Sequence, residues 1–239
     1  MLLAHNAILP ENGEFLRDEK GAYIPRNEFL EAIESAVVFY YIKKDKALEN
    51  KIKKLILATD TKPKLKALAK SIKKEVFAKY PVLDGLEIPQ KTYLPDEAIQ
   101  KVWVERFDIK RQEFTERFES EAFKGVIEEF TIESPNLQKI KTALLSYARG
   151  LADHEHEELK GTILEPYIVE VQNLIANEWA MTLRVGEWTK TPYKGDLLFF
   201  WRIKEVREKL LKEFHLDIRL KDLLFIPKYK EFAGWCEVQ

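Results

Sequence analysis

The spacing of apolar residues changes twice along this chain, and this limits the folds open to it. Between residues 27 and 41 apolar side chains recur every three or four positions, which is typical of a helix with a buried face. Residues 102–132 instead carry aromatic and β-branched side chains, partly alternating with polar ones, as strands do. Helical spacing returns in residues 137–151. Elements mixed in this order predict an α+β fold.

The residues before the first helix are typical of a chain that enters a helix from an extended segment. Proline holds the preceding residue extended, so Ile24-Pro25 predicts that GAYI is the end of a strand. Asn27 is a suitable N-cap, and Glu28 places negative charge in the first turn, where the helix dipole favours it.

Positive charge is concentrated in one part of the chain. Residues 43–79 hold thirteen lysines against four acids, a local balance of +9, although the whole chain has 39 basic and 40 acidic residues. Apolar residues at helical spacing run through both halves of this segment, on either side of Thr61-Lys62-Pro63. We therefore predict a single domain over residues 1–239 with a lysine-rich helical insertion at approximately 43–80.

Two interpretations of this insertion stay open. In the first, Lys62, Lys66, Lys70 and Lys73 follow the phosphates of a nucleic acid, because each neutralised phosphate releases counterions and stabilises the complex. In the second, the lysines form a face that contacts solvent alone, which is the commoner reason for such a run.

The sequence offers no positive case for an enzyme or a bound cofactor. It has no P-loop, nucleophile elbow, HExxH or CxxC motif, and its one cysteine, Cys236, excludes a disulfide framework or a cysteine-based zinc site. No run approaches 18 uninterrupted apolar residues, and the first residues lack the pattern of a signal peptide. We expect a cytoplasmic protein with no membrane partner and no cofactor.

The segment DHEHEE, residues 153–158, is the most metal-like cluster of the sequence. In a strand, His154 and His156 would face the same way and could bind a divalent metal, whereas positions two apart diverge on a helix. Lysines and leucines surround the cluster, so we favour a solvated turn or helix end and expect no metal site.

A glycine-containing loop near the C-terminus combines an aromatic side chain with positive charge. Gly186 permits close approach of the backbone, while Arg184, Lys190 and Lys194 offer charge. Trp188 lies among them in the sequence, where an RNA base could stack on it. Packing in the core explains most of the other aromatic residues in this part of the chain.

Several stretches together resemble one family of proteins. GAYIPRNEFLEAIESAV resembles the YIPGSSLKGAIR-type segment of RAMP-superfamily CRISPR proteins, and ESEAFKGVIEEFTI, residues 119–132, resembles their acid-rich strand hairpin. LRVGEWTKT, residues 183–191, and FAGWCEV, residues 232–238, resemble the glycine-bearing loop and the ending of the fifth subunit of the type III-A Csm effector complex. The order and approximate spacing of these segments match as well.

The resemblance implies a ferredoxin-like, RRM-related framework of RAMP type with insertions. It also implies a non-catalytic subunit of a CRISPR effector complex in antiviral defence, which caps the 3′ end of the guide RNA and assists its trimming by other nucleases. Guide RNA and the other subunits would be its partners. At the start of the first helix, RNA contact would come from Arg26 and backbone amides.

Two other functions stay open at this point. One is a RAMP-type endoribonuclease that processes precursor guide RNA, with His154 or His156 as the general base. The other is a protein-interaction subunit with little RNA contact, which the acidic residues that follow Arg26 would suit.

Overall fold

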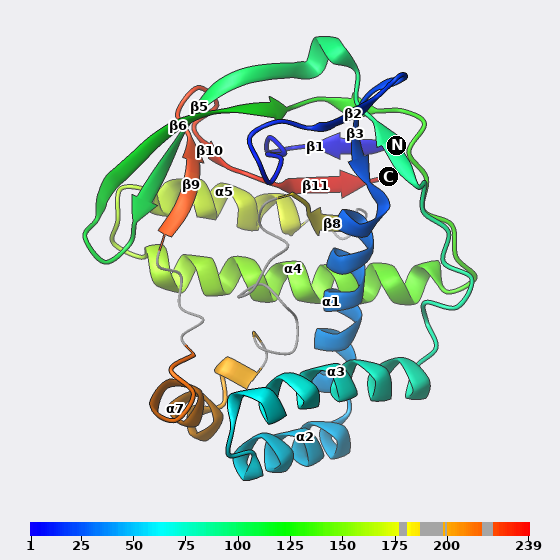
Figure 1. Cartoon of the computed structure of the whole chain (residues 1–239), viewed down its shortest axis with the longest axis vertical. Helices are drawn as coiled ribbons and strands as arrows, with labels where there is room; N and C mark the ends of the chain where they lie inside the picture. Colours follow the sequence, from blue (N-terminus) through cyan, green and yellow to red (C-terminus); the bar gives the residue numbers. More distant parts are fainter. Residues whose placement is uncertain (177–180, 187–197, 199, 217–221) are drawn as a thin grey trace.

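The computed structural model describes residues 1–176, 181–186, 198, 200–216 and 222–239, and the chain has the predicted α+β composition (Figure 1). The helices are α1 (Arg26–Lys44), α2 (Lys46–Ala58), α3 (Lys62–Lys79), α4 (Leu137–Leu159), α5 (Glu165–Ile175) and α7 (Lys204–Lys212), with a 3-10 turn, η1 (Asp96–Ala98). The strands are β1 (Leu2–Ala4), β2 (Leu16–Asp18), β3 (Gly21–Pro25), β4 (Lys91–Tyr93), β5 (Ile99–Asp108), β6 (Glu113–Phe123), β7 (Val126–Ile127), β8 (Met181–Arg184), β9 (Asp222–Ile226), β10 (Glu231–Phe232) and β11 (Trp235–Val238).

The strands form three sheets, and neighbouring strands within each sheet pair antiparallel. The strand orders are β7-β1-β11-β8, β10-β9-β5-β6 and β2-β3-β4. In the first sheet the short β1 lies between β7 and β11, with Leu2 opposite both Ile127 and Val238. This register joins segments that are far apart in the sequence.

Helix α1 is the centre of the core. It begins at Arg26, one residue before the predicted N-cap Asn27, because Pro25 is the last extended residue and occupies the N-cap position. The sequence pattern predicted one buried face, but buried side chains lie almost all round the helix, since it packs against α2, α3, α4 and β8. Where α1 crosses α4, the helix α4 has Gly150, and a Cβ there would lie 2.8 Å from Cζ of Phe39.

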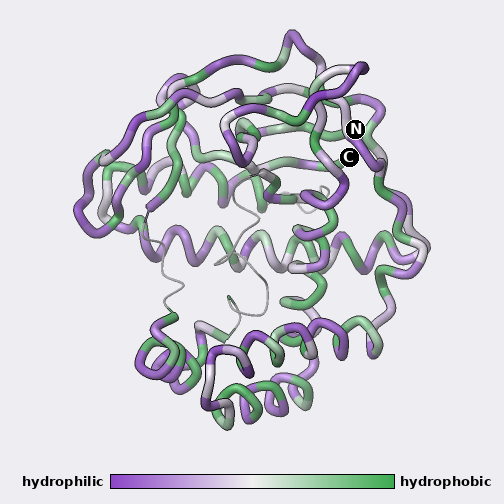
Figure 2. Tube along the Cα trace, in the orientation of Figure 1, coloured by the Kyte–Doolittle hydropathy of each residue, from purple (hydrophilic) through white to green (hydrophobic). Residues whose placement is uncertain are grey.

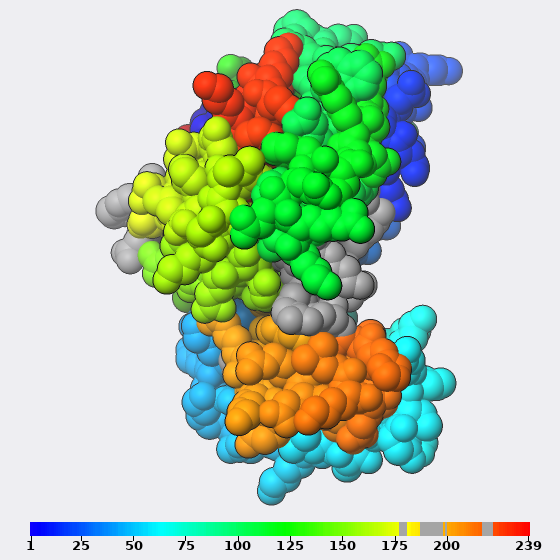
Figure 3. Space-filling model, turned by 90° about the vertical axis from the view of Figure 1, so that its left-hand side faces the viewer, coloured from blue at the N-terminus to red at the C-terminus, as the bar shows by residue number. Residues whose placement is uncertain are grey.

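Helices α2 and α3 form the helical hairpin that the lysine-rich segment predicted. Each helix buries one apolar stripe, and each alternates hydrophilic and hydrophobic residues along its length (Figure 2). Helix α7 packs against α2, so the three helices gather at one end of the molecule, away from the sheets (Figure 3). The lysines are therefore presented on a separate helical layer rather than on a sheet.

Two other elements differ from the expectation. At the end of the strand-like stretch expected over residues 102–132, residues 124–132 form only the short β7, because its neighbour β1 is itself only three residues long. The helix expected to end at Leu151 continues to Leu159, since Leu151 and Leu159 are both buried on the same element. None of the described helices is long and apolar enough to cross a membrane.

Asp45 joins the two ends of the helical hairpin. Its carboxylate caps α2 by accepting hydrogen bonds from the backbone N–H groups of Ala47 and Leu48, both at 3.1 Å. It also accepts hydrogen bonds from Lys79 Nζ at 2.6 Å and from the Tyr80 hydroxyl at 2.7 Å. These bonds, first of all the one from Lys79, hold the pKa of Asp45 well below its usual value.

Replacing Asp45 with alanine is expected to lower the free energy of unfolding by about 1 kcal/mol, the usual cost of losing an N-cap. Because its pKa is depressed in the folded state, this contribution is present above the unfolded pKa of about 4 and is lost as the pH falls through the folded pKa. Urea denaturation of Asp45→Ala and the wild type, at about pH 7 and about pH 2, checks this. Asp60→Ala, at an exposed ion pair with Lys64, is the control. A stability difference that is equal at both pH values would contradict the assignment.

Candidate nucleic-acid interface

The predicted RNA-binding lysines of the insertion lie on one face of α3. Lys62, Lys66, Lys70 and Lys73 follow one another at intervals of four, four and three residues, which places them on one side of a helix, and all four are exposed. Lys73 pairs with Glu34 of α1 and lies over the ring of Phe77. Its charge is thus partly engaged within the protein.

The side chains of Lys62, Lys66 and Lys70, unlike those of most other lysines of the hairpin, form no hydrogen bond or ion pair with any residue that the structure describes. Besides Lys73, five other lysines of the hairpin pair with acids. The pairs are Lys46–Glu49, Lys51–Glu75, Lys53–Glu205, Lys64–Asp60 and Lys79–Asp45. The exposed side of α3 therefore carries a row of cations available to an external anion. We call Lys62, Lys66 and Lys70 the lysine row.

Arg26 lies close to α3, at the first turn of α1. Its backbone N–H donates to the Gln90 carbonyl at 3.1 Å, and its side chain is half-buried. With Glu34, Phe77 and Tyr80 it lines a cavity of about 220 Å³ between α1 and the end of α3. The structure thus brings Arg26 toward the hairpin, on a side where Glu34 also lies.

Gly186 meets the Ile-Pro segment across a second cavity. Gly186, Ile24 and Pro25 line a space of about 110 Å³ together with residues 8–12 and 14–16. Gly186 has a φ of +96°, and a Cβ there would lie 2.5 Å from the Leu9 carbonyl oxygen. The close approach that this glycine permits is therefore made by the protein's own backbone. Glutamates are also among the lining residues, so the described walls offer carboxylates rather than cations to a phosphate.

Arg184, predicted to contact RNA, is buried instead. It lies on β8, its guanidinium pairs with Glu155 of α4, and it stacks over Trp235 with its Cζ 5.0 Å from the ring centroid. The side chains of Arg184 and Glu155 are 3% and 1% exposed. A guanidinium in this position cannot reach an external RNA, so the predicted role of Arg184 is corrected to that of a structural ion pair.

The other residues of the predicted loop, Trp188, Lys190 and Lys194, lie outside the described residues, and their contact with RNA stays a prediction.

The two histidines of the DHEHEE segment lie on α4, where side chains two positions apart diverge. His154 is buried and only 5% exposed, so it cannot serve as a general base for an external RNA, and this part of the endoribonuclease alternative is wrong. His156 is half-buried, with Nε2 3.2 Å from the carboxylate of Glu165 at the start of α5. Among the described residues, no group of three or more histidine, cysteine, aspartate or glutamate side chains is placed to hold a metal ion.

Trp103 of β5 is a feature that the sequence analysis missed. It is 49% exposed, and the guanidinium of Arg117 lies over its ring at 4.7 Å. The signal was present in the alternation of the strand, since Val102 and Val104 on either side of it are buried.

Comparison with known proteins finds similarity both in sequence and in structure. A protein of Aquifex aeolicus (strain VF5), described as uncharacterized, is 37% identical over 244 residues, which cover 100% of this chain and 98% of that protein. A chain in the cryo-EM structure of a Csm–crRNA–target RNA ternary complex of a type III-A CRISPR–Cas system matches with a TM-score of 0.61 at 11% identity, over 95% of this chain and 75% of that chain. The crystal structure of T. onnurineus Csm5 matches with a TM-score of 0.49 at 13% identity, over 94% of this chain and 73% of that chain. No protein-family model matches the chain.

The likeness to the chain of the Csm complex bears on the fold. It shows that this chain shares its mixed α+β fold with that chain, as the sequence predicted.

Proposed function

This chain belongs to the same family as the Aquifex aeolicus protein, and from the fold that it shares with a chain of a Csm complex we propose that it is an RNA-binding subunit of a type III CRISPR effector complex. The finer proposal is that it caps or helps to mature the 3′ end of the guide RNA, as a non-catalytic subunit in antiviral defence. We further propose a single RAMP-like domain over residues 1–239 with the insertion at approximately 43–80, and a cytoplasmic location.

The lysine row is the single observation that carries the proposal. Its three exposed ammonium groups recur once per helical turn and lack an acidic partner among the described residues. A regular row of this kind suits a polyanion, whose phosphates exchange bound counterions for protein cations.

Replacing Lys62, Lys66 and Lys70 together with glutamine is expected to weaken binding of a guide-RNA fragment and to make that binding less dependent on salt. Each lost phosphate contact flattens the slope of log affinity against log salt by about 0.7 for single strands, so three contacts account for about 2. Fluorescence anisotropy at several salt concentrations measures the slope.

The matched control replaces Lys46, Lys64 and Lys212 with glutamine. These lysines are equally exposed, but each pairs with an acid of this chain, so the same loss of three charges should change the slope less. Equal slopes for the two triple variants would remove the lysine row from the proposal.

The 3′-end proposal is tested separately with guide-RNA fragments blocked at one end by biotin and streptavidin. A block at the 3′ end should weaken binding, while a block at the 5′ end should leave it unchanged. Equal effects of the two blocks would contradict capping. The same samples are scored for cleavage, and cleavage that His156→Ala abolishes would favour the endoribonuclease alternative instead.

A further inference from the structure

The hairpin of β5 and β6 has one open edge. In the sheet order β10-β9-β5-β6 the strand β6 is outermost, and the hairpin extends beyond α4 and α5 (Figure 1). Residues 113–117 and Glu119 are exposed, and the half-buried Phe118 lies between them. This half of β6 is thus accessible to another molecule along its free edge.

The protein's own backbone shows which groups of β6 point outward. The N–H of Phe123 donates to the Ile8 carbonyl at 3.0 Å, and the N–H of Glu121 donates to the Gly13 carbonyl at 2.7 Å, both away from β5. Outward and inward groups alternate along an antiparallel strand, so the backbone N–H and C=O groups of Glu119 and Arg117 also point outward.

The segment that covers this edge ends too early to cover all of it. Residues 8–13 run along β6 and form their last backbone hydrogen bond at Glu121, with Gly13 beside the Glu119 carbonyl, and then the chain turns toward β2. Within the part of the chain that the structure describes, no strand pairs with the outer edge at Arg117 and Glu119. The outer edge of β6 is thus hydrogen-bonded to the chain's own backbone at Glu121 and Phe123. At Arg117 and Glu119 its outward backbone N–H and C=O groups pair with no described strand.

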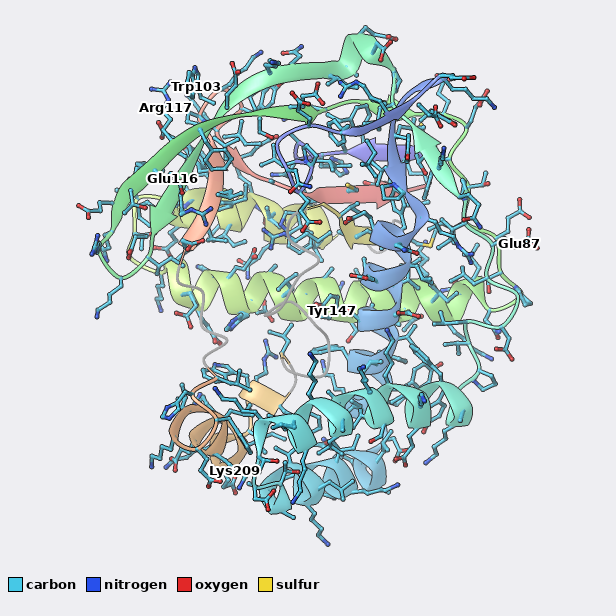
Figure 4. The ribbon with its side chains drawn as sticks, in the orientation of Figure 1. Glu87, Trp103, Glu116, Arg117, Tyr147 and Lys209 are labelled. Atoms are coloured by element: carbon cyan, nitrogen blue, oxygen red, sulfur yellow. The ribbon has the colours of Figure 1, made fainter. Side chains whose placement is uncertain are left out.

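A side-chain anchor lies beside the open edge. Trp103 and Arg117 lie against each other on the hairpin (Figure 4), flanked by the cross-strand pairs Lys101–Glu119 and Glu105–Arg117, each at 3.9 Å. An exposed tryptophan stacked on arginine within a charged rim is typical of the few residues that dominate protein interfaces.

The charge of the exposed residues of β6 indicates which class of molecule can bind along its free edge. The exposed residues between 113 and 119 include three glutamates and one arginine, a balance of −2. Phosphates would be repelled by this strand, whereas a basic polypeptide would be attracted to it. We infer that the free edge of β6 binds an extended, basic segment of a neighbouring protein chain by strand addition, with Trp103 and Arg117 as the side-chain anchor.

This inference goes beyond the proposed function, because it requires no RNA contact. It also gives the open edge a purpose, since an unprotected edge strand is otherwise a site of unwanted association. The lysine row lies on α3 rather than on this hairpin, so variants at the two places separate the two proposals.

The test uses the full chain and a peptide of about ten residues, the length of β5, that alternates lysine and valine. Amide hydrogen exchange at Arg117 and Glu119 should slow when this peptide is added. An otherwise identical peptide with proline at its centre keeps the charge but cannot pair along its length, and it should protect these amides far less. Equal protection by the two peptides, or none by either, would overturn strand addition.

Two variants at one position separate backbone from side-chain binding. Glu119→Pro removes the outward N–H without removing a hydrogen bond to β5, and it should weaken binding of the lysine–valine peptide by about five- to tenfold. Glu119→Ala keeps that N–H and should bind the lysine–valine peptide more tightly than Glu119→Pro does. Equal losses in both variants would assign the binding to side-chain charge and overturn the inference.

Protection of the same amides by a single-stranded RNA, without protection by the lysine–valine peptide, would assign this edge to RNA. The exchange measurement on the wild-type chain decides the inference even where Glu119→Pro fails to fold.

Discussion

Replacing Glu155 with alanine is expected to lower the free energy of unfolding by about 3–5 kcal/mol, the usual cost of removing one member of a buried ion pair. Arg184 of β8 has its guanidinium over the ring of Trp235 of β11, and the substitution would remove the buried Glu155 carboxylate that pairs with it. Thermal or urea unfolding of Glu155→Ala measures the loss.

The control is Glu157→Ala, two residues along the same helix at an exposed position, which should change stability by less than about 0.5 kcal/mol. A second variant, Glu155→Leu combined with Arg184→Met, removes both charges and keeps apolar bulk. It should be far more stable than Glu155→Ala, because a buried pair contributes little beyond the apolar residues that can replace it. A double variant as unstable as the single one would show that the charges themselves hold this layer together.

Replacing Ile33 with alanine is expected to cost about 2–5 kcal/mol, the range for removing a large aliphatic side chain from a packed core. Ile33 is 0% exposed, and α1 is surrounded by other elements, so the surroundings cannot readily close the cavity. Chemical denaturation gives the difference directly.

Glu31→Ala, on an exposed position of the same helix, tests whether any change in α1 is costly. It should have nearly the stability of the wild type. A near-neutral Ile33→Ala would contradict the central place of α1 in the core.

Local patterns in the sequence predicted the helices and the fold class. Apolar spacing located α1, α2 and α3, and the Ile24-Pro25 step located the end of β3, because each depends on residues close together in the chain. The same spacing cannot count how many neighbours a helix has. For that reason it predicted one buried face for α1, which is buried almost all round.

The candidate site was predicted less completely than the fold. The exposure of the lysine row could be predicted from the sequence, because a lysine on the outer face of a helix needs no partner from a distant segment. Arg184 was assigned to the surface because its burial depends on Glu155, which lies 29 residues away in the sequence. Gly186 was recognised as a place of close approach, yet the group that approaches it, the Leu9 carbonyl, belongs to a distant segment. Long-range pairings of this kind leave no local signal.

The position of β1 between β7 and β11 also has a consequence for how the chain folds during synthesis. Leu2 lies opposite Val238, so the edge of β1 that pairs with β11 stays unpaired until residues 235–238 have been made and have left the ribosome. Contacts between such distant residues form slowly, because the loop entropy must be overcome before they contribute. We therefore expect the helical hairpin of α2 and α3, which is local in sequence, to form early on the nascent chain, and the first sheet to close last.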